Sequence, residues 1–257
     1  MDIVVCPLSV VPVRKEPSDR AEMVTQWLFG ETANVLDRQD KWSRLKFHLD
    51  GYEGWVDNKQ LVPSPQAPPK QAKRSIEATA TVDLGETKLI LPMGAVVEFP
   101  DRSDGVIPLH GSPIATGKSI ADLEGPITLR AMLMTRPFIG APYLWGGRTP
   151  WGVDCSGFTQ MVYLLAGLHL PRDAHQQAEV GTTIELLDLV QPGDLAFFDN
   201  DEGRIVHVGF ILPGPDGSRF IVHASGQVRL DKLDQQGIFH IAEKRYSHKL
   251  RLVKRVA

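Results

Sequence analysis

Short runs of β-branched and aromatic residues fill positions 1–62, separated by Pro, Gly, Asp and Asn. Residues 42–47 alternate between apolar and polar side chains, Asp50-Gly51 is a hairpin signal, and residues 52–56 supply the returning strand. The pattern predicts strands at 3–5, 10–13, 27–29, 33–36, 42–47 and 54–56. So many short strands in so few residues indicate a small all-β barrel over residues 1–62.

A proline-rich run over residues 63–69 interrupts this pattern and is typical of an extended linker, which we place at 63–74. Weaker strand signals follow at 80–84, 87–91, 96–99, 105–109 and 127–128. They predict a second small all-β barrel over residues 75–128. No residue-level repeat relates the two regions.

The apolar spacing changes after residue 128. A helix is expected at 129–135, a second at 156–167 where apolar residues recur at intervals of three and four, and a short third one at 173–180. Strand signals then follow at 194–198, 206–212, 220–224 and 250–253. Helices followed by antiparallel-looking strands predict an α+β domain over residues 129–257.

A candidate nucleophile stands at the start of the second expected helix. Asp154 is a natural N-cap residue, which places Cys155 in the first turn. The positive end of a helix favours thiolate over thiol, so we expect a reactive cysteine. The other cysteine, Cys6, follows the apolar run Ile-Val-Val and is expected to be an inert buried thiol.

Two of the eight histidines, His207 and His223, lie on strand-like runs joined by a Pro- and Gly-rich turn. Antiparallel pairing would bring their imidazoles together, so that His207 acts as base toward Cys155 and His223 orients it. The alternative is that both are ordinary hydrogen-bonded core residues. His175 and His248 are expected to lie outside the site.

Composition excludes several classes of partner and cofactor. The net charge of −3 gives no general attraction to nucleic acid or to an anionic membrane, and no apolar run is long enough to span a bilayer. The first residues show no positively charged leader, so a cytoplasmic location is expected unless a leader has been removed. The cysteine stands alone, the two histidines are 16 residues apart in the sequence and no paired-ligand motif occurs, so neither a metal nor a cofactor is predicted.

The motifs around these residues resemble those of the NlpC family of bacterial cell-wall cysteine peptidases. They are Tyr-Leu-Trp-Gly-Gly at 143–147, Asp-Cys-Ser-Gly-Phe at 154–158, Gln-Pro-Gly-Asp-Leu-Ala-Phe-Phe at 191–198, His-Val-Gly at 207–209 and His-Ala at 223–224. The N-terminal part resembles bacterial SH3-like domains. The resemblance implies an α+β protein with two SH3-like barrels followed by a papain-like domain.

The resemblance also implies an activity. It suggests hydrolysis of the γ-D-glutamyl-L-diamino acid bond in murein peptides that carry a free N-terminal L-Ala. Cys155 would be the nucleophile, His207 the base and His223 its orienting partner. The residues that would contact the substrate are Tyr143, Trp145, Asp154, Ser156, Asp173, Ala174, Glu16 and Tyr52.

The resemblance gives some of these residues specific roles. Tyr143 would help to stabilise the oxyanion beside the N–H of Cys155. Glu16, Asp173 and Tyr52 would form a pocket for the substrate's ammonium group. Glu16 could instead be a solvated turn carboxylate, and Tyr52 a cross-strand neighbour of Trp42 or Trp55.

Two other functions fit the same residues. The protein could be a murein-peptide binding module with an inert third domain, or a cysteine-dependent acyltransferase or amidase. The intact set of one cysteine and two histidines favours hydrolysis over binding. The identity of the diamino acid and the oligomeric state stay open.

Overall fold

The computed structural model describes residues 2–64, 72–83, 88–98 and 123–257. The chain divides into two compact units, Met1–Leu123 and Glu124–Ala257. Within the described residues, no helix is long and apolar enough to cross a membrane.

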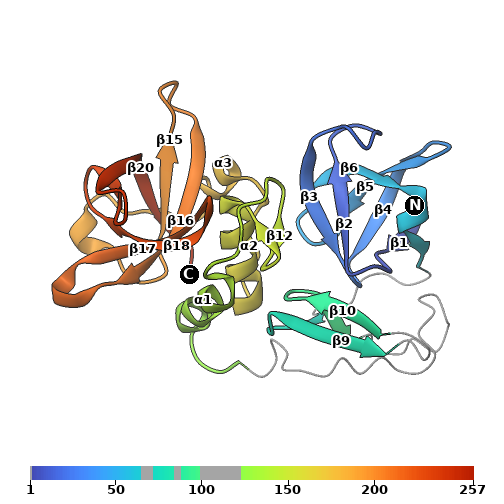
Figure 1. Ribbon diagram of the computed structural model, residues 1–257, viewed down its shortest axis with the longest axis horizontal. Helices are drawn as coiled ribbons and strands as arrows, with labels where there is room; N and C mark the ends of the chain where they lie inside the picture. The colour runs from blue at the N-terminus through green and yellow to red at the C-terminus, as the bar shows by residue number, and fades with distance from the viewer. Residues whose placement is uncertain (1, 65–71, 84–87, 99–122) are drawn as a thin grey trace. The chain divides into compact units, whose positions relative to one another are not determined.

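The first unit is built on a seven-stranded antiparallel sheet in the order β3-β2-β6-β5-β4-β1-β7. Its strands, in blue in Figure 1, are β1 (Ile3–Val5), β2 (Val10–Arg14), β3 (Met23–Leu28), β4 (Thr32–Arg38), β5 (Trp42–Phe47), β6 (Glu53–Asp57) and β7 (Val62–Pro63). The strands expected over residues 1–62 are confirmed. Buried Trp27, Val11 and Leu45 lie in its core, where Trp27 also meets Phe47.

Cys6 belongs to the same core and is fully buried. Its thiol donates to the carbonyl oxygen of Leu8, and burial raises its pKa far above the ordinary value. The prediction of a buried Cys6 is confirmed.

Four further strands belong to this unit and form two two-stranded sheets. They are β8 (Lys73–Arg74), β9 (Thr79–Asp83), β10 (Lys88–Pro92) and β11 (Val96–Glu98). A buried ion pair of 2.9 Å joins Arg74 to Glu31, so β8 is fixed to the turn before β4. The linker expected over residues 63–74 begins and ends in strand, because Pro63 belongs to β7 and Lys73–Arg74 form β8. Residues 65–71 of that linker and the strand expected at 105–109 lie outside the described residues.

The second unit begins with helices. They are α1 (Ile127–Thr135), the short 3-10 turn η3 (Arg136–Phe138), α2 (Cys155–Ala166) and α3 (Ala174–Gln177). The strand expected at 127–128 is wrong, because these residues begin α1 directly after Pro126, a residue that helices tolerate at their start. Every residue of α2 is buried, and Gly167 ends it in the left-handed conformation at φ 97°.

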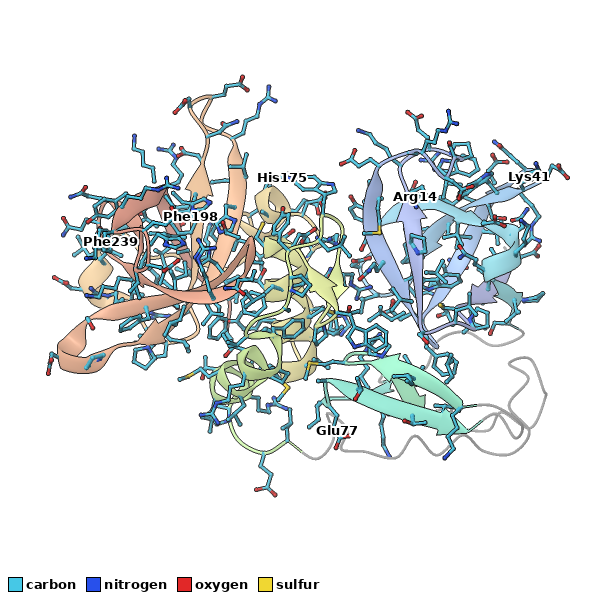
Figure 2. All side chains as sticks on the ribbon, in the orientation of Figure 1. Arg14, Lys41, Glu77, His175, Phe198 and Phe239 are labelled. Atoms are coloured by element: carbon cyan, nitrogen blue, oxygen red, sulfur yellow. The ribbon has the colours of Figure 1, made fainter. Side chains whose placement is uncertain are left out.

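A seven-stranded antiparallel sheet in the order β14-β20-β15-β16-β17-β18-β19 completes this unit. Its strands are β14 (Thr182–Thr183), β15 (Leu195–Asp199), β16 (Ile205–Pro213), β17 (Arg219–Ser225), β18 (Gln227–Leu233), β19 (Gly237–His240) and β20 (Arg245–Arg255). Because β19 also pairs with β20, strands β15 to β20 close on themselves. Figure 1 shows the helices gathered beside these strands, and Figure 2 marks Phe198 of β15 among the packed side chains. The α+β prediction is confirmed for this unit, although β14, β18 and β19 were not expected.

Candidate active site

The N-terminus of α2 is held by Asp154. Its backbone is extended (φ −92°, ψ 177°) and its carboxylate accepts a 2.7 Å hydrogen bond from the N–H of Gly157, so the predicted N-cap is confirmed. The same carboxylate accepts a 2.8 Å bond from the N–H of Gly146 in the preceding loop. A Cβ on Gly157 would lie only 2.1 Å from the carbonyl oxygen of Gly147, so this loop packs directly on the helix start.

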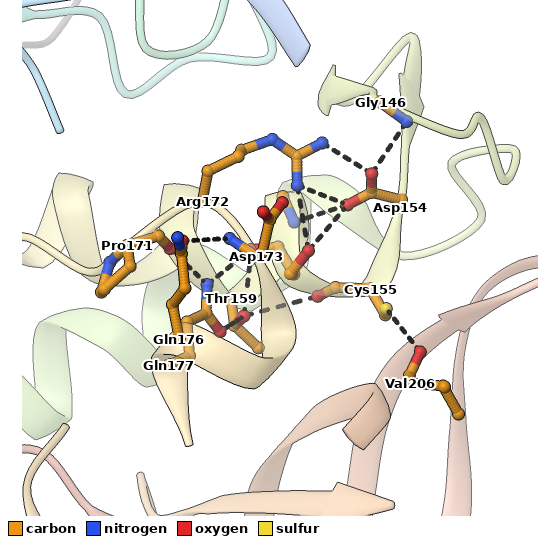
Figure 3. A network of polar contacts seen from close by, with 12 residues as sticks. Gly146, Asp154, Cys155, Thr159, Pro171, Arg172, Asp173, Gln176, Gln177 and Val206 are labelled. Atoms are coloured by element: carbon orange, nitrogen blue, oxygen red, sulfur yellow. Dashed lines mark hydrogen bonds and ion pairs between the residues drawn. The ribbon is translucent and has the colours of Figure 1, made fainter. Parts of the chain in front are cut away.

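Arg172 neutralises Asp154, although no role for Arg172 was predicted from the sequence. Its guanidinium contacts both carboxylate oxygens of Asp154, at 2.6 and 3.0 Å, and donates a third bond of 2.9 Å to the Ser156 hydroxyl (Figure 3). The Ser156 hydroxyl also donates to Asp154. The carboxylate of Asp154 thus accepts five hydrogen bonds, one each from Gly146, Ser156 and Gly157 and two from Arg172. A carboxylate offers roughly four acceptor positions, so none is left for a further donor.

These hydrogen bonds occupy the side chains of two residues that were expected to contact substrate, Asp154 and Ser156. The side chains of Asp154 and Ser156 are both 6% exposed and committed to each other and to Arg172. Any contact that these two positions make with a substrate would therefore use their backbone groups.

Cys155 is the first residue of α2, and its sulfur points at strand β16. The thiol is directed at the carbonyl oxygen of Val206, 4.0 Å away (Figure 3), and the N–H of Val208 lies close enough to lower its pKa. The sulfur is therefore beside the main chain on both sides of His207.

Burial acts against the thiolate that the start of a helix favours. Burial, and then the carboxylate of Asp154, raise the pKa of Cys155 to about 12, although the N–H groups of Val208 and Ser156 and the charge of Arg172 act the other way. Only 7% of Cys155 is exposed. Loss of hydration thus outweighs the field of the helix terminus, and the resting group is a thiol that needs a base.

His207 on β16 and His223 on β17 form the expected pair. Phe210 pairs with Val222, which places the two histidines near each other on one face of the hairpin. His207 Nε2 and His223 Nδ1 are 2.9 Å apart, and the rings meet nearly at right angles. Burial lowers the pKa of both imidazoles, that of His207 well below 6.5, so both are neutral at rest.

Behind His223 lies a carboxylate that the sequence analysis missed. Asp231 on β18 is 2% exposed, and its Oδ2 is 3.1 Å from His223 Nε2. Arg229 donates to the same oxygen at 2.8 Å. The local pattern pointed away from it: Val228 and Leu230 alternate in a way that predicts an outward-facing Asp231, yet Asp231 is buried and Leu230 is 43% exposed.

A third imidazole, that of His248 on β20, was also expected elsewhere but lies at the site. Its ring stacks on that of His207 with centroids 4.2 Å apart and planes inclined by 19°. Burial lowers its pKa to about 4. Its position depends on the pairing of β19 with β20, which no local signal announces.

The three imidazoles were tested as a metal site, since their ring nitrogens lie within 4.8 Å of one another. Imidazole binds a metal in the plane of its ring, and the planes of His207 and His248 are stacked. His207 Nε2 and His223 Nδ1 already share a hydrogen bond. The arrangement therefore suits proton transfer better than metal binding.

Four other expected residues lie around the start of α2. Tyr143 is partly exposed, and burial, then the charges of Cys155 and Asp154, raise its pKa to about 12, so its hydroxyl stays a donor. Trp145 in the same loop is 60% exposed. Asp173 precedes α3 as its N-cap and Ala174, which is buried, begins it, directly after Arg172.

Glu16 and Tyr52 belong to the first unit. Glu16 is exposed on the turn after β2. Tyr52 is half-buried, packs against the barrel core and bonds through its carbonyl oxygen to the N–H of Phe47. Trp42 pairs with Asp57, and Trp55 pairs with Arg44. Neither tryptophan is therefore the cross-strand neighbour of Tyr52.

Comparison with known proteins agrees with this picture. The model of the NlpC/P60 family matches residues 140–246, and that of the bacterial dipeptidyl-peptidase Sh3 domain matches residues 13–61. Dipeptidyl-peptidase 6 of Lysinibacillus sphaericus is 38% identical over 256 residues, which cover 86% of this chain and 88% of that protein.

More distant relatives extend the comparison. The γ-D-glutamyl-L-lysine dipeptidyl-peptidase of Bacillus cereus is 27% identical over 74% of this chain, and the chain spans 65% of its length. The protein of the same name from Bacillus subtilis is 29% identical, with 74% of this chain and 69% of that protein covered. A crystal structure of an NlpC/P60 family protein from Bacillus cereus shares the fold, with a TM-score of 0.76 over 99% of both chains at 21% identity. The chain belongs to the NlpC/P60 family and carries a bacterial SH3-type domain before its catalytic-type domain.

Proposed function

We propose that this member of the NlpC/P60 peptidase family is a cysteine peptidase that hydrolyses the γ-D-glutamyl-L-diamino acid bond of murein peptides. One observation carries the proposal. The sulfur of Cys155 lies against the main chain on both sides of His207, and His207 is hydrogen bonded to the buried His223. A nucleophile, a base and an orienting group in this order are what acyl transfer from an amide requires.

The reaction would begin from neutral groups. The ring nitrogen of His207 that does not bond His223 takes the thiol proton as the sulfur of Cys155 attacks the γ-carbonyl carbon of D-Glu. The oxyanion is stabilised by the N–H of Cys155 at the helix start and by the hydroxyl of Tyr143, which stays protonated because its pKa is raised to about 12.

Collapse of this intermediate breaks the C–N bond. The protonated His207 gives its proton to the leaving amine of the diamino acid, and a thioester remains on Cys155. Water, deprotonated by His207, then attacks the thioester and the proton returns to the sulfur. The products are L-Ala-D-Glu and a peptide that begins with the diamino acid.

Recognition of a free N-terminal L-Ala is the finer part of the proposal. Asp173 would pair with the substrate's ammonium group, and Glu16 and Tyr52 of the first unit are proposed as further contacts of that group. Trp145 and Ala174 would contact the substrate, and Asp154 and Ser156 would do so through their backbone groups. An N-acetylated substrate would leave these carboxylates without a cation and would bind poorly.

Three further features are proposed with this function. The catalytic unit would be papain-like, with the helix that carries the nucleophile packed on the strands that carry the histidines. The β8–β11 and β9–β10 pairs would belong to the second SH3-like barrel, whose expected bounds of 75–128 shift because β8 begins at Lys73 and α1 begins at Ile127. A cytoplasmic location is proposed as well, and fractionation of producing cells would test it.

The test is hydrolysis of a defined peptide followed by mass spectrometry. L-Ala-γ-D-Glu-L-Lys is the first substrate, because the names of the two Bacillus relatives specify L-lysine, and the diaminopimelate peptide and the N-acetylated peptide follow. Cys155→Ala should abolish cleavage, whereas Cys6→Ala, at the other buried thiol, should retain it. Cleavage by Cys155→Ala would refute the mechanism, and binding without cleavage by the unmodified protein would favour a binding module.

A further inference from the structure

We propose that Asp231 is a positioning residue that fixes the tautomers of both His223 and His207, and so leaves the correct nitrogen of His207 free to accept the thiol proton. The inference rests on the catalytic roles proposed above for Cys155 and His207. It adds a fourth residue behind the nucleophile, the base and the orienting histidine.

The environment of Asp231 makes its carboxylate an obligatory acceptor. Its Oδ1 accepts a 2.9 Å bond from the N–H of Ile241, and its Oδ2 accepts a 2.8 Å bond from Arg229 Nε. Burial by itself would raise the pKa of Asp231, but the hydrogen bonds from His223, Ile241 and Arg229 and the charge of Arg229 lower it well below its ordinary value. An ionised carboxylate has no proton to donate.

The tautomers follow one after another from this acceptor. His223 Nε2, 3.1 Å from Asp231 Oδ2, must carry the ring proton of the neutral imidazole. His223 Nδ1 is then an acceptor, so His207 Nε2, which lies 2.9 Å from it, must be the donor. His207 Nδ1 is therefore left with a free lone pair.

That lone pair would lie on the side of the sulfur. Nδ1 is the ring nitrogen nearer to the main chain, and the sulfur of Cys155 lies beside the main chain at Val206 and Val208. The stacked ring of His248 covers one face of the His207 ring and limits its rotation. The opposite tautomer would present an N–H to the thiol and could not accept its proton.

Asp231→Asn is the informative change. The N–H of Ile241 requires an acceptor, so the asparagine would keep its oxygen there and turn its NH₂ group toward His223 Nε2. His223 would then carry its proton on Nδ1 and donate to His207 Nε2, which forces the inactive tautomer on His207. Arg229 is partly exposed and can turn away from the amide.

We expect Asp231→Asn to lower kcat by roughly 10²- to 10⁴-fold, as loss of a general base or of the correct tautomer does in enzymes of this kind, with KM changed little. Alkylation of Cys155 by iodoacetamide at pH 7 should slow in parallel, because it needs the same proton acceptor. The matched control is Asp234→Asn, an acid just after the same strand that bonds Gln236 and Tyr246 and touches no imidazole. It should leave both rates within about twofold, the change typical of a surface substitution.

Nitrogen-15 NMR of the histidine-labelled full chain reads the tautomers directly. In the unmodified protein, both His207 and His223 should carry their proton on Nε2, and in Asp231→Asn both should carry it on Nδ1. A proton on Nδ1 of His207 in the unmodified protein would overturn the proposal even if Asp231→Asn failed to fold. Unchanged alkylation and tautomers in a folded Asp231→Asn would overturn it too.

These readouts separate the inference from the proposed function. Alkylation and NMR need no substrate, so they test Asp231 even if no murein peptide is cleaved. If the expected tautomers are found but no peptide is cleaved, the proposed substrate is wrong and the role of Asp231 in fixing the tautomers of His223 and His207 still stands.

Discussion

The ion pair between Asp154 and Arg172 should be the most costly single contact to break in the second unit. In Arg172→Met, the carboxylate of Asp154 would stay buried, at 6% exposure, without a cation. Arg172 supplies it with two charged hydrogen bonds of 2.6 and 3.0 Å. The N–H groups of Gly146 and Gly157 remain and offset part of the loss.

Two estimates of the loss agree. Charge-assisted hydrogen bonds contribute about 1.5–3 kcal/mol each, which gives about 3–6 kcal/mol for two. Removal of one partner from a buried pair costs about 3–5 kcal/mol. We therefore expect the free energy of unfolding to fall by about 3–5 kcal/mol, which corresponds to a drop in Tm on the order of 10 °C for a chain of this size.

The assay is thermal unfolding followed by circular dichroism, with a matched control. Arg204→Met removes the same side chain from an exposed pair with Glu202, whose partners are 79% and 66% exposed, and should cost less than about 1 kcal/mol. Asp154→Asn combined with Arg172→Met should recover part of the loss, because asparagine still caps α2 and carries no charge. The reasoning is refuted if Arg172→Met is no less stable than Arg204→Met, or if the double variant is the least stable of all.

Three further predictions concern pH and packing. Burial lowers the pKa of His207 well below 6.5 and raises that of Cys155 to about 12. We therefore expect kcat/KM to be constant from pH 6.5 to about 8, where the substrate amine titrates, and to fall at lower pH as His207 takes up a proton. Rates measured over pH 4–9 test this, and a fall in rate centred above pH 6.5 would contradict it. Burial lowers the pKa of His248 to about 4, so between pH 6.5 and 4 the unfolded chain binds a proton that the folded chain does not. The free energy of unfolding should therefore fall as pH drops through this window. The urea midpoints at pH 7 and pH 4.5 should differ less in His248→Phe, which keeps the stacking, than in the unmodified protein. Gly157→Ala should lower the Tm, although the same change stabilises an ordinary helix by about 1 kcal/mol. The new Cβ would lie 2.1 Å from the carbonyl oxygen of Gly147, in the loop before α2. An increase in Tm would contradict this prediction and show that the loop can shift at little cost.

Local signals were sufficient for much of the fold. Alternation predicted β5 at Trp42–Phe47 to the residue, and the N-cap preference placed the start of α2 beside Asp154. Ile127 and Thr128 were misread because β-branched residues favour strands, whereas here they follow a proline and pack as the first turn of a helix. In that case the tertiary context overrode the propensity.

The parts of the site that escaped prediction depend on strands far apart or on an atypical strand. The run from Gln227 to Leu233 carries charged side chains, so it looks like a solvated segment until the turn at Gly226, with φ 73°, folds it back on β17. His248 approaches His207 only because β20 pairs with both β15 and β19. Arg172 was missed because an arginine beside an aspartate in sequence gives no sign that it pairs with Asp154 instead.

The raised pKa of Cys155 changes the part that the helix start plays in the chemistry. If the sulfur were already a thiolate, the rate would depend on how much thiolate is present, and the tautomer of His207 would matter little. Because burial raises the pKa of Cys155 and lowers that of His207, the thiol would keep its proton until the proposed attack, and the proton would pass to a neutral His207 in the same step. The N–H groups at the start of α2 then stabilise negative charge as it develops on sulfur and oxygen, so their contribution is greatest in the transition state. In such a site the direction of one lone pair on His207 would limit the rate. A buried carboxylate two hydrogen bonds away, at Asp231, should therefore change turnover while leaving substrate binding almost unaltered.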